Sequence, residues 1–195
     1  MSTAAAAPAR TGAVLADLLP STRVRDIALV AGGAVLTGVA AQIAVPVPGS
    51  PVPVSGQTFA ALLVGTALGA RRGFLALALY AVAGMAGTPW FAQGTSGYGM
   101  PSFGYILGMV LAAAVVGALA RRGADRSVAR MAGTMAVGSL IIYAVGVPYL
   151  AFATGMSLAQ AVTVGLLPFL IGDALKAALA MGAVPTAWKL VGRRG

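Results

Sequence analysis

The sequence contains no cysteine, no histidine and no glutamate. Without cysteine the chain has no disulfide, thiol nucleophile or thiolate metal site. Without histidine and glutamate it also lacks most metal-binding constellations and the usual general bases. Its acidic residues are four aspartates, Asp17, Asp26, Asp125 and Asp173. So few reactive groups argue against an enzyme, and we expect no catalytic residue, metal site or cofactor in this chain.

Charged residues are also scarce. They make up 9% of the chain, whereas hydrophobic residues make up 59%; a soluble domain carries about a quarter charged residues. Such a set cannot cover a water-soluble surface, so most side chains must face lipid or other helices. Because an apolar helix needs about 20 residues to cross a bilayer, six spans would use roughly 120 residues. The composition predicts an all-α integral membrane protein with six transmembrane helices.

Hydropathy and proline positions set the expected boundaries. The apolar segments lie at 27–45, 55–70, 73–87, 104–120, 131–150 and 168–189. Residues 23–195 are expected to form this single six-helix transmembrane domain, and residues 1–22, rich in Ala, Pro and Thr, a disordered cytoplasmic tail. A cleaved signal peptide fits poorly, because Pro8, Arg10 and Asp17 interrupt its apolar stretch.

Two segments between the spans have unusual composition. Residues 46–54 are apolar but contain four prolines, so they cannot form a continuous helix. We expect a re-entrant or capping segment there, buried in protein. In the mixed stretch 151–167, Ser157 could cap a short helix that Pro168 interrupts.

The positions of the cations predict the orientation. If the N-terminus is inside and each span crosses once, twelve of the thirteen lysine and arginine residues fall on one side of the membrane. They lie in the segments 10–25, 71–72, 121–130 and 189–194. The positive-inside rule makes that side, with both the N- and C-termini, cytoplasmic. The net charge of +9 is then explained by orientation and by contact with anionic membrane lipid, and not by nucleic acid.

The thirteenth cation, Lys176, lies inside the last predicted span together with Asp173. Their i, i+3 spacing places both side chains on one helix face. At about 1.5 Å per residue they lie roughly 8–12 Å beyond Pro168, in the outer half of the membrane. Ionisable groups at that depth commonly face a cavity or a partner. Two interpretations are open: a self-neutralising pair that packs this helix against a neighbour, or a site for a small polar ligand with N–H groups and a carbonyl or carboxylate.

Further candidate residues lie on the same outer side. Gln57 and Thr58 begin the second span and could either bind a ligand or cap the helix. The glycine-rich stretch 91–99 could turn free backbone N–H groups toward a ligand. Tyr98 and Tyr105 offer apolar walls with polar tips, or belong to an interfacial aromatic belt.

Two observations concern partners. The only lysines, Lys176 and Lys189, follow no glycine-rich P-loop, so ATP-driven transport would need another subunit to hydrolyse the ATP. Small residues at helical spacing in 31–41 would let another helix approach the first span closely, and that helix could be internal or external. A homo-oligomer is left open.

The chain resembles the BioY family, the biotin-specific substrate-binding (S) components of energy-coupling factor (ECF) transporters. The likeness covers nearly everything after about residue 24. It rests on the order and spacing of several motifs: Pro51-Val52-Pro53-Val54 before Gln57-Thr58-Phe59, Leu63-Val64-Gly65 through Leu68-Gly69, Arg71-Arg72-Gly73, Gly104-Tyr105, and Pro168-Phe169 with Gly172-Asp173-Ala174-Leu175-Lys176.

This resemblance implies an ECF S-component-like bundle that captures biotin from the outer side of the prokaryotic plasma membrane and delivers it inward. In such proteins an Asp and a Lys of the last helix help to hold the polar head of the vitamin, and an outer loop closes over it. The residues thereby assigned to the biotin site are Asp173, Lys176, Gln57, Thr58, Thr95, Ser96, Tyr98 and Tyr105. The family loop commonly reads Gly-Pro-Thr before its Gly-Tyr, so the stretch 99–105 differs in length and content.

The resemblance also implies partners. A transmembrane coupling subunit would dock on the small-residue face of the first span, two ATPase subunits would bind that coupling subunit, and the ATP would be used by these partners. Three alternatives stay open from the residues alone: an S component for another vitamin, a stand-alone transporter or channel, and an intramembrane enzyme.

Overall fold

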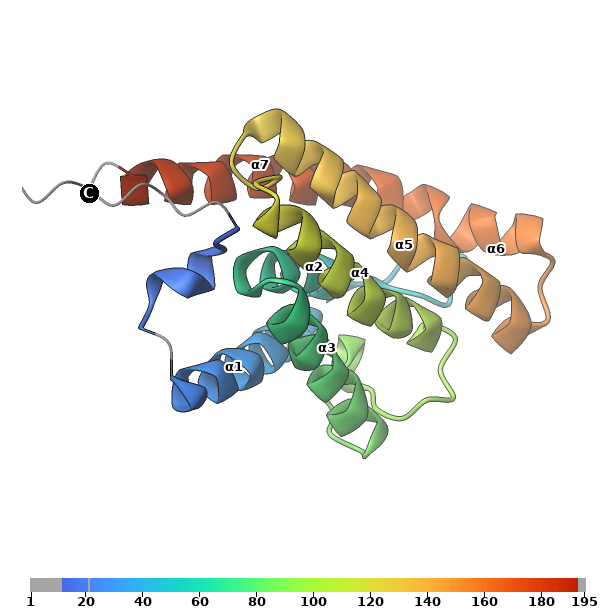
Figure 1. Ribbon diagram of the computed structural model, residues 1–195. Coiled ribbons are helices and arrows are strands. Elements are labelled where there is room, and N and C mark those ends of the chain that lie inside the picture. Colours follow the sequence, from blue (N-terminus) through green and yellow to red (C-terminus); the bar gives the residue numbers. More distant parts are fainter. Residues whose placement is uncertain (1–11, 21, 193–195) are drawn as a thin grey trace, which may run out of the picture.

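The computed structural model describes residues 12–20 and 22–192. Helices make up most of this part of the chain (Figure 1): α1 (Arg23–Ala41), α2 (Gln57–Leu68), α3 (Ala70–Met85), α4 (Phe103–Arg121), α5 (Val128–Thr154), α6 (Leu158–Gly165) and α7 (Leu170–Gly192). The short elements are the 3-10 helices η1 (Leu15–Leu18), η2 (Ala92–Gly94) and η3 (Leu167–Phe169), and an antiparallel hairpin of β1 (Ala44–Val45) and β2 (Val54–Ser55). The all-α fold expected from composition is confirmed.

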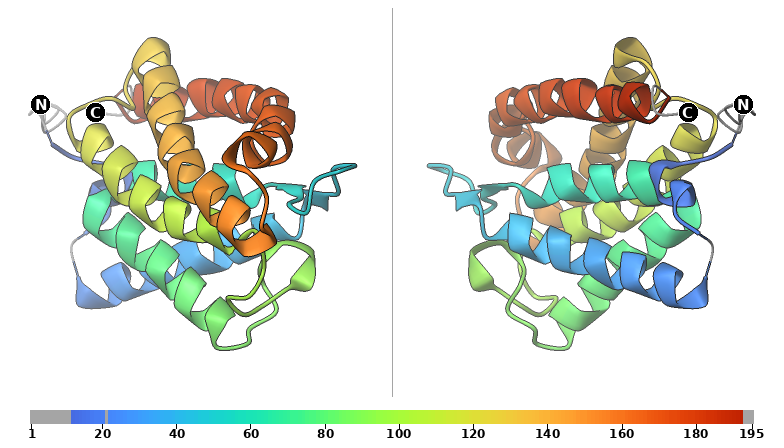
Figure 2. Two further views of the ribbon diagram at one scale, coloured as in Figure 1. Left: turned by 90° about the vertical axis from the view of Figure 1, so that its right-hand side faces the viewer. Right: turned by 90° about the vertical axis from the view of Figure 1, so that its left-hand side faces the viewer.

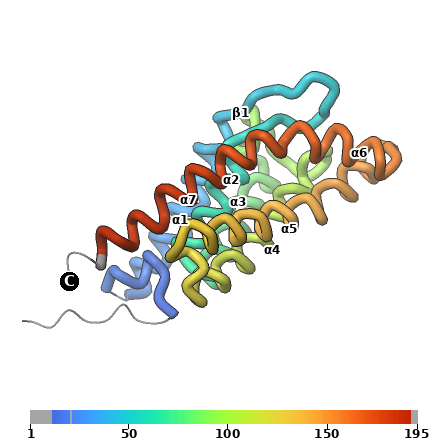
Figure 3. The backbone as a smooth tube through the Cα atoms, turned by 90° about the horizontal axis from the view of Figure 1, so that it is seen from above, coloured from blue at the N-terminus to red at the C-terminus, as the bar shows by residue number. Residues whose placement is uncertain are grey.

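Helix α4 lies at the centre of the bundle. It packs against α2, α3 and α5, while α1 packs on α2 and α3, and α7 packs chiefly on α5 (Figures 1 and 2). Seen from above, α5 and α7 run alongside each other (Figure 3). The described helices therefore form two groups around α4, with α5, α6 and α7 on one side and α1 and α3 on the other.

Glycine lets α4 approach its neighbours closely. A Cβ atom at Gly108 would lie 2.8 Å from the Cα of Ile142 in α5, and one at Gly65 in α2 would lie 2.6 Å from a backbone oxygen of α4. In lipid, where hydrocarbon tails are as apolar as leucine, close backbone packing is a main source of helix association. These contacts hold α2 and α5, two of the helices that carry the site, against one central helix.

The small residues of α1 have an internal partner. Five of them are buried: Gly33, Ala34, Thr37, Gly38 and Ala41. A Cβ atom at Gly38 would lie 3.1 Å from the ring of Trp90, and one at Gly33 would lie 3.0 Å from the Cβ of Ala76 in α3. The opposite side of α1 exposes larger apolar residues, among them Val35, Leu36 and Val39. The sequence left open whether these small residues pack against a helix of this chain or of another protein. For these five residues the partners lie within the chain.

The helix boundaries agree closely with the predicted segments. Each of the six apolar segments overlaps one of the helices α1 to α5 and α7, and the ends differ by at most four residues. The short helix after residue 151 is confirmed as α6: the Ser157 Oγ caps it by accepting a hydrogen bond from the backbone N–H of Gln160. Pro168 then lies in η3, between α6 and α7.

The number of helices that are long enough to cross a membrane is smaller than the six predicted spans. In the described residues, four helical stretches are long and apolar enough to cross a membrane: α1, α4, α5 and the run from Leu158 to Val191. Helix α2 has 12 residues and α3 has 16, or about 18 and 24 Å, short of about 30 Å of hydrocarbon. Six crossings and cytoplasmic termini stay predictions.

The N-terminal segment corrects one prediction. Residues 12–20, expected in a disordered tail, are ordered around η1, with Val14 and Ala16 buried. Asp17 forms ion pairs with Arg72 at 2.8 Å and Arg121 at 3.3 Å. Asp17, which interrupts the apolar stretch in the sequence, thus anchors this N-terminal segment to α3 and α4 through its two ion pairs. Residues 1–11 and 21 of the predicted tail lie outside the described residues.

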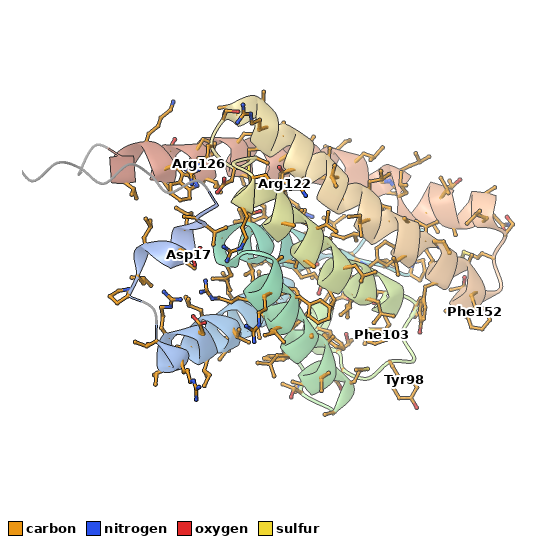
Figure 4. All side chains as sticks on the ribbon, in the orientation of Figure 1. Asp17, Tyr98, Phe103, Arg122, Arg126 and Phe152 are labelled. Atoms are coloured by element: carbon orange, nitrogen blue, oxygen red, sulfur yellow. The ribbon has the colours of Figure 1, made fainter. Side chains whose placement is uncertain are left out.

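Charged groups gather at one end of the bundle. Figure 4 places Asp17, Arg122 and Arg126 at this end and Tyr98 and Phe152 at the opposite end. The starts of α1 and α3 and the end of α7, which carry other described cations apart from Lys176, lie at the charged end too (Figure 1). This arrangement agrees with the single side inferred from the sequence.

A buried carboxylate fixes the far end of α7 to this charged end. The Trp188 Nε1 of α7 donates a hydrogen bond of 2.6 Å to Asp125, which is 0% exposed. The Arg126 guanidinium lies 4.0 Å over the same indole ring. Burial raises the pKa of the Asp125 carboxyl. The loop between α4 and α5 therefore holds the helix that carries Asp173 and Lys176.

The Asp17 ion pairs predict a pH dependence of stability. Burial alone would raise the pKa of Asp17, but the hydrogen bond from Arg72 and the nearby Arg121 outweigh it and hold the pKa below its usual 3.8. A group with a depressed pKa stabilises the fold above its unfolded pKa, and this contribution is lost as the pH falls through the folded pKa.

Asp17→Asn should therefore lower the thermal stability of the purified protein at pH 7, by about 1 kcal/mol or less for such a partly exposed site. The difference from wild type should shrink as the pH falls below about 4. Thermal unfolding in detergent across this pH range measures it. A deficit that is the same at pH 7 and pH 3 would contradict the ion-pair explanation.

Candidate ligand-binding site

A cavity lies where α2, α5 and α7 meet the hairpin and η3. It holds about 410 Å³ of empty space, a volume that includes the open space at its mouth. The residues that line it are Val52, Pro53, Ser55, Gln57, Thr58, Tyr105, Ser139, Ile142, Tyr143, Phe169, Asp173 and Lys176. These residues belong to the hairpin segment, α2, α4, α5, η3 and α7.

Four polar side chains form a hydrogen-bonded cluster across this cavity. The Lys176 Nζ donates to the Thr58 Oγ1 at 2.7 Å and to the Asp173 Oδ1 at 3.3 Å. The Tyr143 hydroxyl donates to the other Asp173 oxygen. We call Thr58, Tyr143, Asp173 and Lys176 the polar cluster. It joins α2, α5 and α7 by their side chains.

The geometry distinguishes between the two interpretations of the Asp–Lys pair. The two charges do meet, and both side chains are less than one fifth exposed. However, they do not only pack one helix against another, because both line the cavity. A carboxylate that accepts N–H donors and an ammonium that donates, side by side in an open space, have the chemistry that a polar ligand needs, and the binding of such a ligand stays a prediction.

Neither Gln57 nor Thr58 caps α2, which begins after Gly56 without a side-chain cap. The Gln57 Oε1 instead accepts a hydrogen bond of 2.9 Å from the Tyr80 hydroxyl. The Gln57 amide nitrogen forms no hydrogen bond with the described residues, and the side chain lines the cavity. Thr58 accepts from Lys176. Both residues therefore face the site, and the capping alternative does not apply.

Aromatic rings form one wall of the cavity. Tyr105 stacks on Phe169 with their ring centroids 6.5 Å apart, and its edge meets Tyr143 at 6.3 Å. The Tyr105 hydroxyl donates to the backbone oxygen of Gly165 at 2.7 Å. The hydroxyl proton of Tyr105 is therefore already engaged, which leaves its ring and the acceptor side of its oxygen.

The proline-rich segment 46–54 is non-helical, as predicted, and covers the cavity from one side. It connects β1 to β2, whose backbones pair from Ala44 to Ser55. Val52 is buried, and Val52, Pro53 and Ser55 line the cavity. The predicted burial of the whole segment is wrong, however, because Pro46, Pro48 and Pro51 are exposed and Val52 is the one buried residue in 46–54.

The outer-loop residues lie outside the cavity lining. The Thr95 Oγ1 donates to the backbone oxygen of Ala92, Ser96 is exposed, and Tyr98 is 70% exposed. Figure 4 shows Tyr98 at the far end of the molecule. The structure thus brings Gln57, Thr58, Tyr105, Asp173 and Lys176 together but not these three. Closure of the loop over a ligand stays a prediction.

Sequence reasoning missed the contribution of α5. Ser139 and Tyr143 lie one helical turn apart and both line the cavity, and Phe169 lines it from η3. The i, i+4 spacing of two polar side chains inside an apolar span could have indicated that this face is turned inward. Phe169 stands in the motif quoted above, but no role was assigned to it.

A sequence model of the BioY family matches residues 10–193. The chain belongs to the BioY family. Among relatives named as biotin transporters, the probable biotin transporter BioY of Lysinibacillus sphaericus is 36% identical over 135 residues, which is 68% of either chain. That of Pyrococcus horikoshii is 35% identical over 140 residues, 70% of this chain and 81% of the relative.

A solved structure shares the fold of this BioY family member. It is the crystal structure of the S-component for biotin from an ECF-type ABC transporter. The TM-score is 0.77 at 21% identity, and the match covers 87% of this chain and 95% of the other. The S-component-like bundle implied by the sequence is therefore confirmed.

The polar cluster predicts a selective effect of one hydroxyl. Tyr143→Phe removes the donor to Asp173 and should lower the free energy of unfolding by about 1–3 kcal/mol, because a partly buried carboxylate loses one of its partners. Tyr98→Phe is the matched control. The Tyr98 side chain is exposed, so the loss of its hydroxyl should leave the free energy of unfolding unchanged. Thermal unfolding of both variants in detergent measures this. Equal stability of the two would contradict a role for Tyr143 in holding Asp173.

Proposed function

We propose that this chain binds biotin and serves as the S component of an ECF-type uptake transporter. The observation that carries the proposal is the polar cluster inside a cavity among apolar helices, in a member of the BioY family. The membership supports transport and not catalysis. The named relatives are biotin transporters, and the solved neighbour is an S-component for biotin.

The chemistry of biotin fits the groups that line this cavity. Its ureido ring presents two N–H donors beside a carbonyl acceptor, and Asp173 accepts whereas Lys176 and the Gln57 amide donate. Its sulfur-containing ring and alkyl chain are apolar and suit the wall of Tyr105 and Phe169. One small molecule can therefore satisfy both the polar cluster and the aromatic wall.

Energy must come from other subunits in this proposal. The chain contains no P-loop lysine, so ATP would be hydrolysed by ATPase subunits bound to a transmembrane coupling subunit. The buried small residues of α1 are already packed internally, whereas Val35, Leu36 and Val39 are exposed. The outward, apolar side of α1 is therefore the part of this helix that is open for docking. A homo-oligomer is an alternative use of the same surface.

The proposed setting is the prokaryotic cytoplasmic membrane, with the charged end of the bundle inside and residues 23–195 as one membrane domain. The gathering of the cations at one end supports this orientation, by the positive-inside rule and by attraction to anionic lipid. Asp173 and Lys176 lie near the start of α7, away from the charged end where α7 finishes. The cavity would then receive biotin from outside.

Binding of biotin to the purified protein tests the proposal. Asp173→Asn and Lys176→Ala should each weaken binding by about 30-fold or more, since each removes a charged hydrogen-bonding group worth on the order of 2 kcal/mol. Lys189→Ala, an exposed cation at the other end of α7, should bind as wild type does. Isothermal titration in detergent gives the affinities.

Three results would contradict the proposal. Wild-type affinity in both site variants would remove the polar cluster from the binding site. Displacement of biotin by equimolar thiamin or riboflavin would favour an S component for another vitamin, and biotin uptake by liposomes that contain this chain alone would favour a stand-alone transporter.

A further inference from the structure

A second cavity adjoins the first. It holds about 220 Å³ of empty space between α2, α5 and α7 and is lined by Thr58, Phe59, Leu62, Met135, Ser139, Asp173, Lys176 and Ala177. Four of these residues, Thr58, Ser139, Asp173 and Lys176, also line the first cavity. They stand at the boundary between the two spaces. The other residues of the second cavity are apolar.

Ser139 differs from the other polar residues at this boundary. Thr58, Asp173 and Lys176 are hydrogen-bonded to one another. The Ser139 hydroxyl forms no hydrogen bond within the described part of the chain. Its side chain is partly buried and lines both cavities. The hydroxyl is therefore free to form a hydrogen bond with a molecule that enters the cavity.

Hydroxyls inside helices normally bond to the backbone of the preceding turn. Five threonines of the described helices do so, each donating to the backbone oxygen four residues before it: Thr37, Thr66, Thr134, Thr154 and Thr163. The Ser139 hydroxyl does not form this bond. Its side chain is instead turned to the cavity boundary, on the same face of α5 as Tyr143, which holds Asp173.

The boundary offers two acceptors and a donor. Asp173 on α7 and the Ser139 hydroxyl oxygen on α5 can each accept an N–H, and Lys176 donates beside Asp173. A cyclic urea presents the complementary set, two N–H groups on either side of one carbonyl. Asp173 can take only one side of such a ring, so the other N–H needs an acceptor from a different helix.

We propose that Ser139 determines specificity in this site, its hydroxyl oxygen accepting one of the two ureido N–H groups of biotin. The proposal rests on the proposed function. In this proposal α5 contacts the ligand as α2 and α7 do. The proposal also explains why the Ser139 hydroxyl does not donate to the backbone of the preceding turn, as the five threonines do. A ligand without a second N–H cannot form this hydrogen bond with the serine, which lowers its affinity.

The test combines Ser139→Ala with two biotin analogues. In each analogue one ureido N–H is replaced by a ring oxygen, which gives the two cyclic carbamates without adding atoms. Alanine keeps the helix propensity of the position, so the variant should fold. Its affinity for biotin should fall about 5–30-fold, the effect of one lost hydrogen bond. For one of the two carbamates the same substitution should change affinity by no more than about twofold.

Thr163→Ala is the matched control. It also removes a hydroxyl from a helix, but Thr163 is exposed on α6 and bonded to its own backbone. It should bind biotin and both carbamates as wild type does. Unchanged biotin affinity in Ser139→Ala would overturn the inference, and so would an equal loss for biotin and both carbamates. If folded wild-type protein binds no biotin, the proposed function is wrong, and the role of Ser139 in binding biotin is overturned with it.

Discussion

The site depends on one constraint, which is that the charges of Asp173 and Lys176 must be compensated among apolar helices. An unpaired charge in such surroundings costs several kcal/mol. Here the two charges meet each other, and Thr58 from α2 and Tyr143 from α5 supply further hydrogen bonds. The compensation draws three helices to one place, and the space left between them is the cavity. The residues proposed to bind the ligand are therefore also the residues that join the three helices.

The rest of the fold keeps these three helices in position. Glycines at Gly65 and Gly108 let α2 and α5 rest closely on α4. Helix α7 has fewer neighbours inside the bundle and is instead fixed at its far end, where Trp188 binds the buried Asp125. A ligand that engages Asp173 and Lys176 would thus act on a helix that is anchored at its other end.

The sequence was most informative where one residue type carries a clear physical meaning. Prolines marked 46–54 as non-helical, Ser157 marked the start of α6, and Lys176 with Asp173 stood out because charges are rare inside apolar spans. It could not show that Asp17 would order residues 12–20, since its partners Arg72 and Arg121 are distant in the chain. Nor could it assign Ser139 and Tyr143, whose side chains gain meaning only from the face of α5 that α7 covers. The outer loop lies apart from the cavity, and its closure over a ligand stays a prediction.

The central claim is that the cavity around the polar cluster holds biotin. The most direct measurement is the biotin content of the protein purified in detergent from cells supplied with the vitamin, determined by mass spectrometry after the folded protein is denatured. The account predicts biotin retained in proportion to the protein, and little in a sample of Asp173→Asn prepared in the same way. Folded wild-type protein that carries no biotin and takes none up when it is added would contradict the account.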